Sequence, residues 1–137
     1  MPRQTQLTRL NVVAGILVDA SNRVLIAERT GDGPFHGLWE FPGGKINAGE
    51  AARAALAREL EEEIGIEVCD LKPFMRLEHR YPDRHVEIEF FLVERWLNEP
   101  AGLEGQALQW IHVGKLDHAT LLPADEPVVA ELKRELG

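Results

Sequence analysis

The sequence holds a single cysteine, Cys69, among its 137 residues. One cysteine cannot close an internal disulfide or build a cysteine-ligated zinc site. Cys69 follows the apolar residues Ile66 and Val68, a context that predicts a buried structural thiol. The sequence also has no apolar run long enough to span a bilayer, and its N-terminal residues lack the apolar core of a signal peptide. These absences favour a cytoplasmic protein without a membrane partner.

Positive charge is scarce too, since 15 lysines and arginines stand against 23 aspartates and glutamates, a net charge of -8 at pH 7. This balance argues against a protein that binds polymeric nucleic acid through its charge. A small anionic ligand is compatible with it if divalent cations bridge ligand and protein. The composition is otherwise that of a globular protein, with 45% hydrophobic residues. At this length we expect one domain over residues 1–137, acting as a monomer.

Hydrophobic periodicity predicts an α+β fold. Runs rich in β-branched and aromatic residues predict strands at residues 10–18, 24–28, 38–41, 74–78, 85–96 and 108–113. A short turn separates the first two strands, which predicts a hairpin. Helices are expected at about residues 48–64 and 123–136. We therefore expect a mixed sheet sandwiched between two main helices.

The most distinctive segment spans residues 43–66 and reads GGKINAGEAARAALARELEEEIGI. On a helix, Glu59, Glu62 and Glu63 stand at positions i, i+3 and i+4, so three carboxylates share one face. Like charges at this spacing repel, and a bound cation would neutralise them. Carboxylate oxygens are hard ligands that suit Mg²⁺ or Mn²⁺. The simpler alternative is an acidic helix face exposed to water.

The same helix carries its own packing and stop signals. Leu56, Leu60 and Ile64 recur at i, i+4 and i+8 and predict a buried apolar stripe. Gly65 follows directly, at a position where helices commonly end in a left-handed residue. The helix is therefore expected to bury this stripe and to end at Gly65.

Residues 44–66 resemble the Nudix box, GX5EX7REUXEEXGU. Five residues separate Gly44 from Glu50, seven more precede RELEEEIGI, and every specified position of the box is filled. Three segments outside the box resemble the MutT branch of this superfamily: LWEFPGG at 38–44, YPDRH at 81–85 and ADEPV at 124–128. The resemblance implies the Nudix α/β/α sandwich and a divalent-metal requirement. It also implies hydrolysis of a nucleoside triphosphate to a monophosphate and pyrophosphate.

The MutT-like segments imply 8-oxo-dGTP as the substrate, and with it a role in nucleotide-pool sanitation and mutation avoidance. The implied cofactor is Mg²⁺, with Mn²⁺ as an alternative. A second interpretation is a pyrophosphohydrolase for CTP, a dCTP analogue or another nucleotide derivative. A third is a nucleotide-sensing domain without catalysis, although the intact box argues against it.

The resemblance also assigns chemical roles to residues. The implied metal ligands are the backbone carbonyl of one glycine and four carboxylates: Gly43, Glu59, Glu62, Glu63 and Glu104. Glu59 is the preferred general base, with Glu50 and Glu104 as alternatives. Arg58 is implied to orient a glutamate of the box rather than to bind the metal.

The implied substrate contacts are Arg29, His36, Glu40, Phe41, Pro42, Gly43, Arg84 and Asp125. Arg29 would suit a phosphate or a base oxygen, although a surface charge at a strand end is an equal alternative. Phe41 is a candidate wall of the base pocket. At Asp125 the sequence departs from the MutT branch, which has Asn at this position. The difference matters for base recognition, because an amide both donates and accepts hydrogen bonds whereas a carboxylate donates only when protonated. As an alternative, Asp125 caps the last helix.

Overall fold

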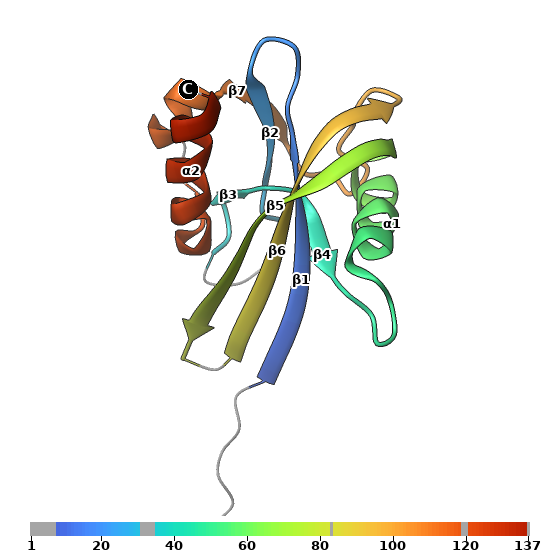
Figure 1. Ribbon diagram of the computed structural model, residues 1–137, viewed down its shortest axis with the longest axis vertical. Coiled ribbons are helices and arrows are strands. Elements are labelled where there is room, and N and C mark those ends of the chain that lie inside the picture. Colours follow the sequence, from blue (N-terminus) through green and yellow to red (C-terminus); the bar gives the residue numbers. More distant parts are fainter. Residues whose placement is uncertain (1–7, 31–34, 83, 119–120, 137) are drawn as a thin grey trace, which may run out of the picture.

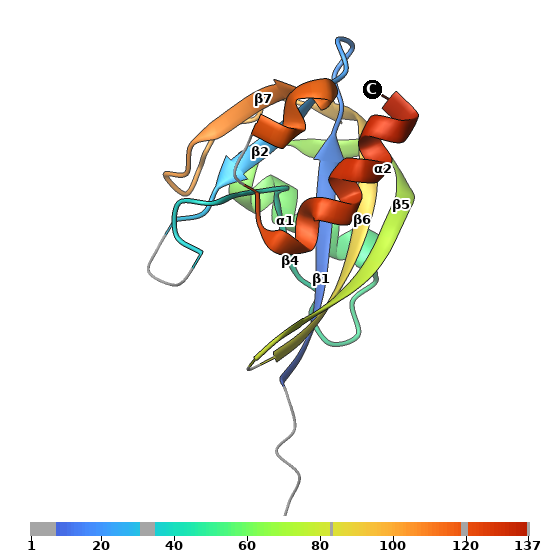
Figure 2. The same cartoon turned by 90° about the vertical axis from the view of Figure 1, so that its left-hand side faces the viewer.

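The computed structural model describes residues 8–30, 35–82, 84–118 and 121–136. Within them the chain forms a four-stranded sheet and a three-stranded sheet. Helices α1 (Ala52–Ile64) and α2 (Glu126–Leu136) lie on opposite faces of the larger sheet (Figures 1 and 2). This arrangement confirms the predicted α+β sandwich.

The larger sheet is mixed and supplies the long central strands. Its order is β4 (Gly43–Lys45), β1 (Thr8–Leu17), β6 (Arg84–Leu97) and β5 (Glu67–Tyr81). β1 and β6 run parallel, whereas β1 pairs with β4, and β6 with β5, in antiparallel fashion. The short strand β4 therefore places two glycines directly against β1, just ahead of the turn that leads into α1.

The smaller sheet has the order β3 (Trp39–Glu40), β2 (Arg23–Glu28) and β7 (Leu108–His112). The predicted hairpin between residues 10–18 and 24–28 is wrong, because β1 and β2 belong to different sheets. A single bridge between Val18 and Val24 joins them across the turn. The central residues of both strands are apolar, so their pattern does not indicate which neighbour each strand pairs with.

Helix α1 begins at Ala52 rather than near residue 48. Gly49 has a φ of +78°, a left-handed conformation that belongs to the turn before the helix. The predicted end of the helix is confirmed, because Gly65 has a φ of 72° and its N–H donates to the carbonyl of Glu61.

Two hydrophobic cores fill the spaces on either side of the larger sheet. The predicted stripe on α1 is confirmed, since Leu56, Leu60 and Ile64 are all fully buried. Successive residues of β1 point to opposite faces, so Val13 packs into the core under α1 and Ala14 into the core under α2. Each face of the sheet thus anchors one helix.

The C-terminal part of the chain contains 3₁₀ segments at η1 (Val113–His118) and η2 (Pro123–Asp125) before α2 begins at Glu126. The prediction of one helix over residues 123–136 is therefore wrong at its start. The Asp125 N–H donates to the Leu122 carbonyl at 2.9 Å, the i to i+3 bond that is typical of a 3₁₀ turn. None of the helices in the described ranges is long and apolar enough to cross a membrane.

Strand β5 is much longer than the strand predicted at residues 74–78, and it is irregular. Its pairing with β6 shifts register between Val68 and Asp70 and again near Pro73. Cys69 lies in the first irregularity and is exposed, so the prediction of a buried thiol is wrong. At a bulge, successive residues no longer alternate regularly between the two faces of the sheet. The apolar neighbours of Cys69 therefore could not predict that its side chain is exposed.

Candidate active site

A cavity of about 370 Å³ opens where β1, β3, β4 and the last turn of α1 come together. The central strands supply apolar lining, including Val12 from β1 and Ile88 and Phe90 from β6. The charged side chains of the lining include Arg29, Glu40, Glu63, Arg84, Glu104 and Asp125. A cavity of this size and mixed lining suits a small organic ligand that carries charge.

Most of the predicted substrate residues meet in this cavity. Of the residues predicted for substrate or metal, the lining contains Arg29, Glu40, Phe41, Pro42, Gly43, Glu63, Arg84, Glu104 and Asp125. The lining does not include four other predicted residues, which lie on α1 and in the turn before it: Glu50, Arg58, Glu59 and Glu62. His36 is exposed in the turn ahead of β3 and is not among the described residues that line the cavity.

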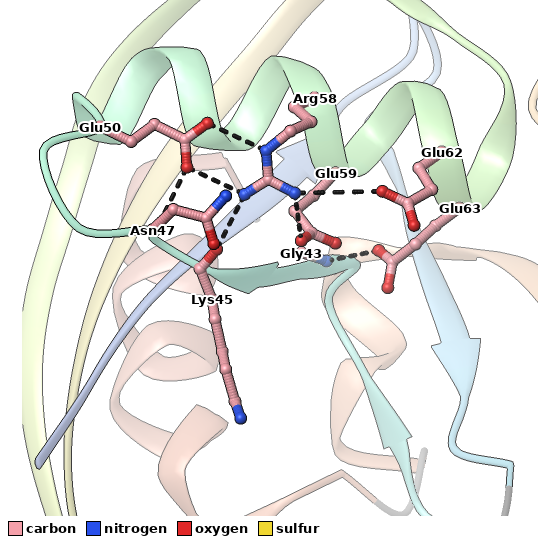
Figure 3. Close-up of polar contacts among 8 residues, drawn as sticks. All are labelled: Gly43, Lys45, Asn47, Glu50, Arg58, Glu59, Glu62 and Glu63. Atoms are coloured by element: carbon pink, nitrogen blue, oxygen red, sulfur yellow. Dashed lines mark hydrogen bonds and ion pairs between the residues drawn. The ribbon is translucent and has the colours of Figure 1, made fainter.

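Arg58 is the centre of a hydrogen-bonded network on α1 (Figure 3). Its Nε and Nη2 donate to the two carboxylate oxygens of Glu50, each at 2.9 Å. Its Nη1 donates to Glu59 Oε1 at 2.8 Å, and its Nη2 also reaches the Lys45 carbonyl at 3.0 Å. Arg58 therefore ties the turn before the helix, the strand β4 and the Glu59 carboxylate together.

The same contacts set the proton affinity of Glu50. The hydrogen bonds from Arg58, followed by the backbone N–H of Asn47, lower the pKa of Glu50 to about 2. Both bonds favour the ionised carboxylate, which explains the direction of the change. Glu50 is thus held in one charge state across the physiological range.

Glu63 has the opposite environment. Its Oε2 accepts a hydrogen bond from the Gly43 N–H at 3.1 Å, which turns the carboxylate toward β4 (Figure 3). Burial, and then the like charges of Glu59, Glu104 and Glu40, raise the pKa of Glu63 to about 8. The carboxylates around Glu63 therefore carry more negative charge than the neighbouring cations neutralise.

The carboxylates of α1 do not form a preassembled metal cluster. Among the residues that the structure describes, no three His, Cys, Asp or Glu side chains are grouped so that they could hold a metal ion. Glu59 is bonded to Arg58, and the side chain of Glu62 is 63% exposed, with its Oε2 3.9 Å from Arg58 Nη1. The i, i+3, i+4 spacing brings these groups to one side of the helix without closing them around a point.

The residues nevertheless fit a hard divalent cation. The donor set on this side of α1 consists of carboxylates, the ligand type that Mg²⁺ and Mn²⁺ prefer. A Cβ at Gly44 would lie 2.4 Å from the Glu59 carboxylate, and a Cβ at Gly43 would lie 2.0 Å from the Val13 carbonyl. Both glycines are therefore needed for the close approach of β1, β4 and Glu59.

Asp125 lines the same cavity from η2, the segment before α2, and is only 4% exposed. Its Oδ2 is buried and finds no hydrogen-bond partner among the described residues, although the carboxylate accepts a bond from the Phe41 backbone N–H. Burial and the nearby charge of Glu40 raise the pKa of Asp125 to about 7. A buried polar atom without a partner is rare and marks a position where a ligand can supply one.

Two arginines, Arg29 and Arg84, also line the cavity. Arg29 Nη1 lies 3.2 Å from Glu40 Oε1, and burial raises the pKa of Glu40. Arg84 lies over the ring of Tyr81, with its guanidinium carbon 5.0 Å from the ring centroid. Within the described part of the chain, the buried Nε of Arg84 has no hydrogen-bond partner. The cavity lining therefore offers both donors and acceptors.

Sequence reasoning missed several residues of the lining. The sequence pattern places Tyr81 only in a turn and gives Gln106 no role of its own, yet both line the cavity. Val12 and Ile88 stand opposite each other in the register of β1 and β6, and both line the cavity as well. Side chains alternate between the two faces of β1 and β6, and this pattern could have grouped Val12 with Ile88. It does not show which face of the sheet opens onto a cavity.

The chain is similar to known proteins over most of its length. A family model described as NUDIX domain matches residues 13–131. The 8-oxo-dGTP diphosphatase of Escherichia coli (strain K12) is 42% identical over 128 residues, which cover 93% of this chain and 99% of that protein. The CTP pyrophosphohydrolase of the same organism is 32% identical over 120 residues, 88% of each chain.

A solved structure is similar over nearly the whole fold. It comes from a study of MutT from Aliivibrio salmonicida and Vibrio cholerae, and it superimposes with a TM-score of 0.83 at 34% sequence identity. The match covers 94% of this chain and all of that one. The sheet and both helices thus have counterparts in a known relative.

Proposed function

The chain belongs to the NUDIX domain family, and on that premise we propose that it hydrolyses 8-oxo-dGTP to 8-oxo-dGMP and pyrophosphate. The family depends on divalent metal ions, and we propose Mg²⁺ for this member. The substrate is supported by the relative named 8-oxo-dGTP diphosphatase, which aligns with 93% of the chain. We further propose that residues 1–137 form a single domain that acts as a cytoplasmic monomer.

The observation that carries the proposal is one cavity with two chemically different ends. Glu63 and Glu104 interact electrostatically with each other and form what we call the phosphate end, whereas Arg29, Arg84 and Asp125 interact with Tyr81 and form what we call the base end. A nucleoside triphosphate has the same division, since its phosphates need cations and its base needs hydrogen-bond partners. Only Phe41 and Pro42 separate β3 from β4 in the chain, and both residues line the cavity.

The phosphate end would hold the metal ion through Glu59, Glu62, Glu63, Glu104 and the carbonyl of Gly43. When bound, Mg²⁺ supplies the positive charge that a triphosphate requires on an acidic protein. Arg58 holds the Glu59 carboxylate beside β4 through its bond at 2.8 Å. Gly44 leaves open the space that this carboxylate fills.

We propose Glu59 as the general base that accepts a proton from the attacking water. Glu50 is the weaker candidate, because a carboxylate with a pKa of about 2 has little affinity for a proton. Its bonds to Arg58 instead support the position of Glu59. Glu104 is an alternative base, since it is exposed and lines the cavity.

The base end would recognise the oxidised guanine mainly through Asp125. An ionised Asp125 accepts hydrogen bonds from the N1–H and the 2-amino group of a guanine edge. A protonated Asp125 donates one bond as well, and its pKa of about 7 allows both forms near neutrality. Phe41 and Pro42 would flank the base, while Arg29, Glu40 and Arg84 complete the polar lining.

A second candidate substrate is CTP. The CTP pyrophosphohydrolase relative supports it, and so does the chemistry of Asp125, because an ionised carboxylate can accept from the 4-amino group of cytosine. The non-enzymatic alternative is a nucleotide-sensing domain. The filled Nudix box weighs against that alternative.

Pyrophosphate release from a panel of 8-oxo-dGTP, dGTP and CTP, measured with and without Mg²⁺, tests these candidates. We expect the highest kcat/KM for 8-oxo-dGTP and loss of turnover in EDTA. Equal or greater kcat/KM for CTP would replace the preferred substrate. Nucleotide binding without turnover of any member would identify a sensing domain.

A further inference from the structure

The side-chain amide of Gln106 forms two hydrogen bonds in opposite senses. Its Nε2 donates to the backbone carbonyl of Glu63 at 3.1 Å, and its Oε1 accepts from the backbone N–H of Glu104 at 2.9 Å. Glu63 ends the acidic face of α1, whereas Glu104 lies in the loop between β6 and β7. A single amide thus joins the backbones of two residues from separate elements.

The loop that carries Glu104 is docked on the C-terminal end of α1. The Ala101 N–H donates to the Ile64 carbonyl at 3.0 Å, and the Leu103 N–H donates to the Glu63 carbonyl at 3.1 Å. These bonds satisfy carbonyls that the helix end leaves without partners. The Gln106 amide adds a side-chain bond to the same Glu63 carbonyl, and Gln106 itself lines the cavity.

The loop also closes tightly around Gln106. A Cβ at Gly102 would lie 2.1 Å from the Gln106 carbonyl and 3.2 Å from its Oε1. The Gly105 N–H donates to the Gly102 carbonyl at 3.2 Å, and Gly105 has a φ of 82°. These turns hold the amide between its two partners.

We propose that Gln106 is a positioning residue that keeps the Glu104 carboxylate beside that of Glu63, so that both can bind one divalent cation. This inference rests on the proposed metal-dependent function. Both carboxylates line the same cavity, yet Glu104 is exposed and its like charge favours separation from Glu63. A loop free to move would have to be ordered when the metal binds, at a cost in conformational entropy.

Glutamine suits this task because the two partners need opposite groups. The Glu63 carbonyl requires a donor, and the Glu104 N–H requires an acceptor. Glutamate at position 106 would keep the acceptor but place a second oxygen against the Glu63 carbonyl. Methionine would fill a similar volume without either bond. Because both replacements keep a side chain of about the same volume, a change in metal affinity reports the loss of hydrogen bonds rather than the loss of packing.

The test measures Mn²⁺ binding to the full chain in the absence of nucleotide, with electron paramagnetic resonance as the readout. For Gln106→Met and Gln106→Glu we expect about tenfold weaker Mn²⁺ affinity, as for outer partners of metal ligands. Gln109→Met is the matched control, since Gln109 is exposed on the neighbouring strand β7, and its affinity should equal that of the wild type. Unchanged affinity in both Gln106 variants would overturn the inference.

A double-mutant cycle with Glu104→Gln separates positioning from general loop stability. If Gln106 acts through Glu104, the double variant Glu104→Gln/Gln106→Met binds Mn²⁺ as weakly as Glu104→Gln alone. Additive losses, or wild-type affinity in Glu104→Gln, would contradict the inference. A wild-type protein that binds no Mn²⁺ and releases no pyrophosphate would instead refute the proposed function itself, so the two failures are distinguishable.

Discussion

Arg58 binds Glu50 through a bidentate contact, in which Nε and Nη2 each donate to one carboxylate oxygen at 2.9 Å. This geometry fixes the plane of both groups and is stronger than a single neutral hydrogen bond. The remaining nitrogen, Nη1, bonds Glu59 at 2.8 Å. The turn before α1 is therefore coupled to the carboxylate that we propose as the general base.

Replacing Arg58 with lysine should lower kcat for 8-oxo-dGTP by about 10- to 100-fold, as loss of an outer partner does. Lysine keeps the charge but cannot hold Glu50 and Glu59 at once, because its ammonium is a single point charge. KM for the nucleotide should change little. Arg95→Lys, at an exposed residue of β6, is the control. A wild-type kcat for Arg58→Lys would exclude the positioning role.

Glu62 and Glu61 are neighbours on α1 and both are exposed, so they form a matched pair. Glu62→Gln should reduce Mg²⁺-dependent turnover by at least about 100-fold, because an amide lacks the charge of a metal ligand. Glu61→Gln removes the same charge from a neighbouring position and should retain wild-type turnover. The assay is pyrophosphate release at several Mg²⁺ concentrations. Equal rates for the two variants would remove Glu62 from the proposed ligands.

Asp125 should make the folded chain less stable as the pH rises. Its pKa is about 7 in the folded chain against an ordinary value of 3.8, so the folded state binds the proton more tightly. The associated stability is fully present below about pH 4 and is lost as the pH rises to about 7.

The substitution Asp125→Asn would supply a neutral side chain of the same shape. The unfolding free energy of this variant, relative to that of the wild type, should therefore increase as the pH rises from 4 to 7, by at most about 4 kcal/mol. Urea unfolding in EDTA measures this difference. Asp70→Asn, at an exposed residue of β5, should show no such trend. A pH-independent difference for Asp125→Asn would contradict the assignment.

The same substitution tests base selection. An amide presents a donor and an acceptor at every pH, whereas an ionised carboxylate only accepts. Asp125→Asn should therefore raise the ratio of kcat/KM for 8-oxo-dGTP to that for CTP by about tenfold, the effect of roughly one hydrogen bond. Parallel assays at pH 8 measure the ratio. A ratio that stays the same or falls would indicate that Asp125 does not contact the base.

The sequence was most informative where structure is local. The spacing of Leu56, Leu60 and Ile64 predicted a buried helix face, and Gly65 predicted its end. Both follow from the helical period and from glycine's access to left-handed backbone, which depend on neighbours a few residues away. The hairpin of residues 10–18 and 24–28 failed, because strand pairing depends on distant partners.

The order of the residues was enough to predict the acidic helix, its position after two glycines and the family resemblance that links both to a metal-dependent hydrolase. The contacts of these groups are visible only in the folded chain. The fold placed Arg58 between Glu50 and Glu59, buried Asp125 against Phe41 and set the Gln106 amide between Glu63 and Glu104. The contacts of Asp125 with Phe41 and of Gln106 with Glu63 join segments far apart in the chain. Their geometry follows from how the sheet packs against α1 and α2, which no local pattern encodes.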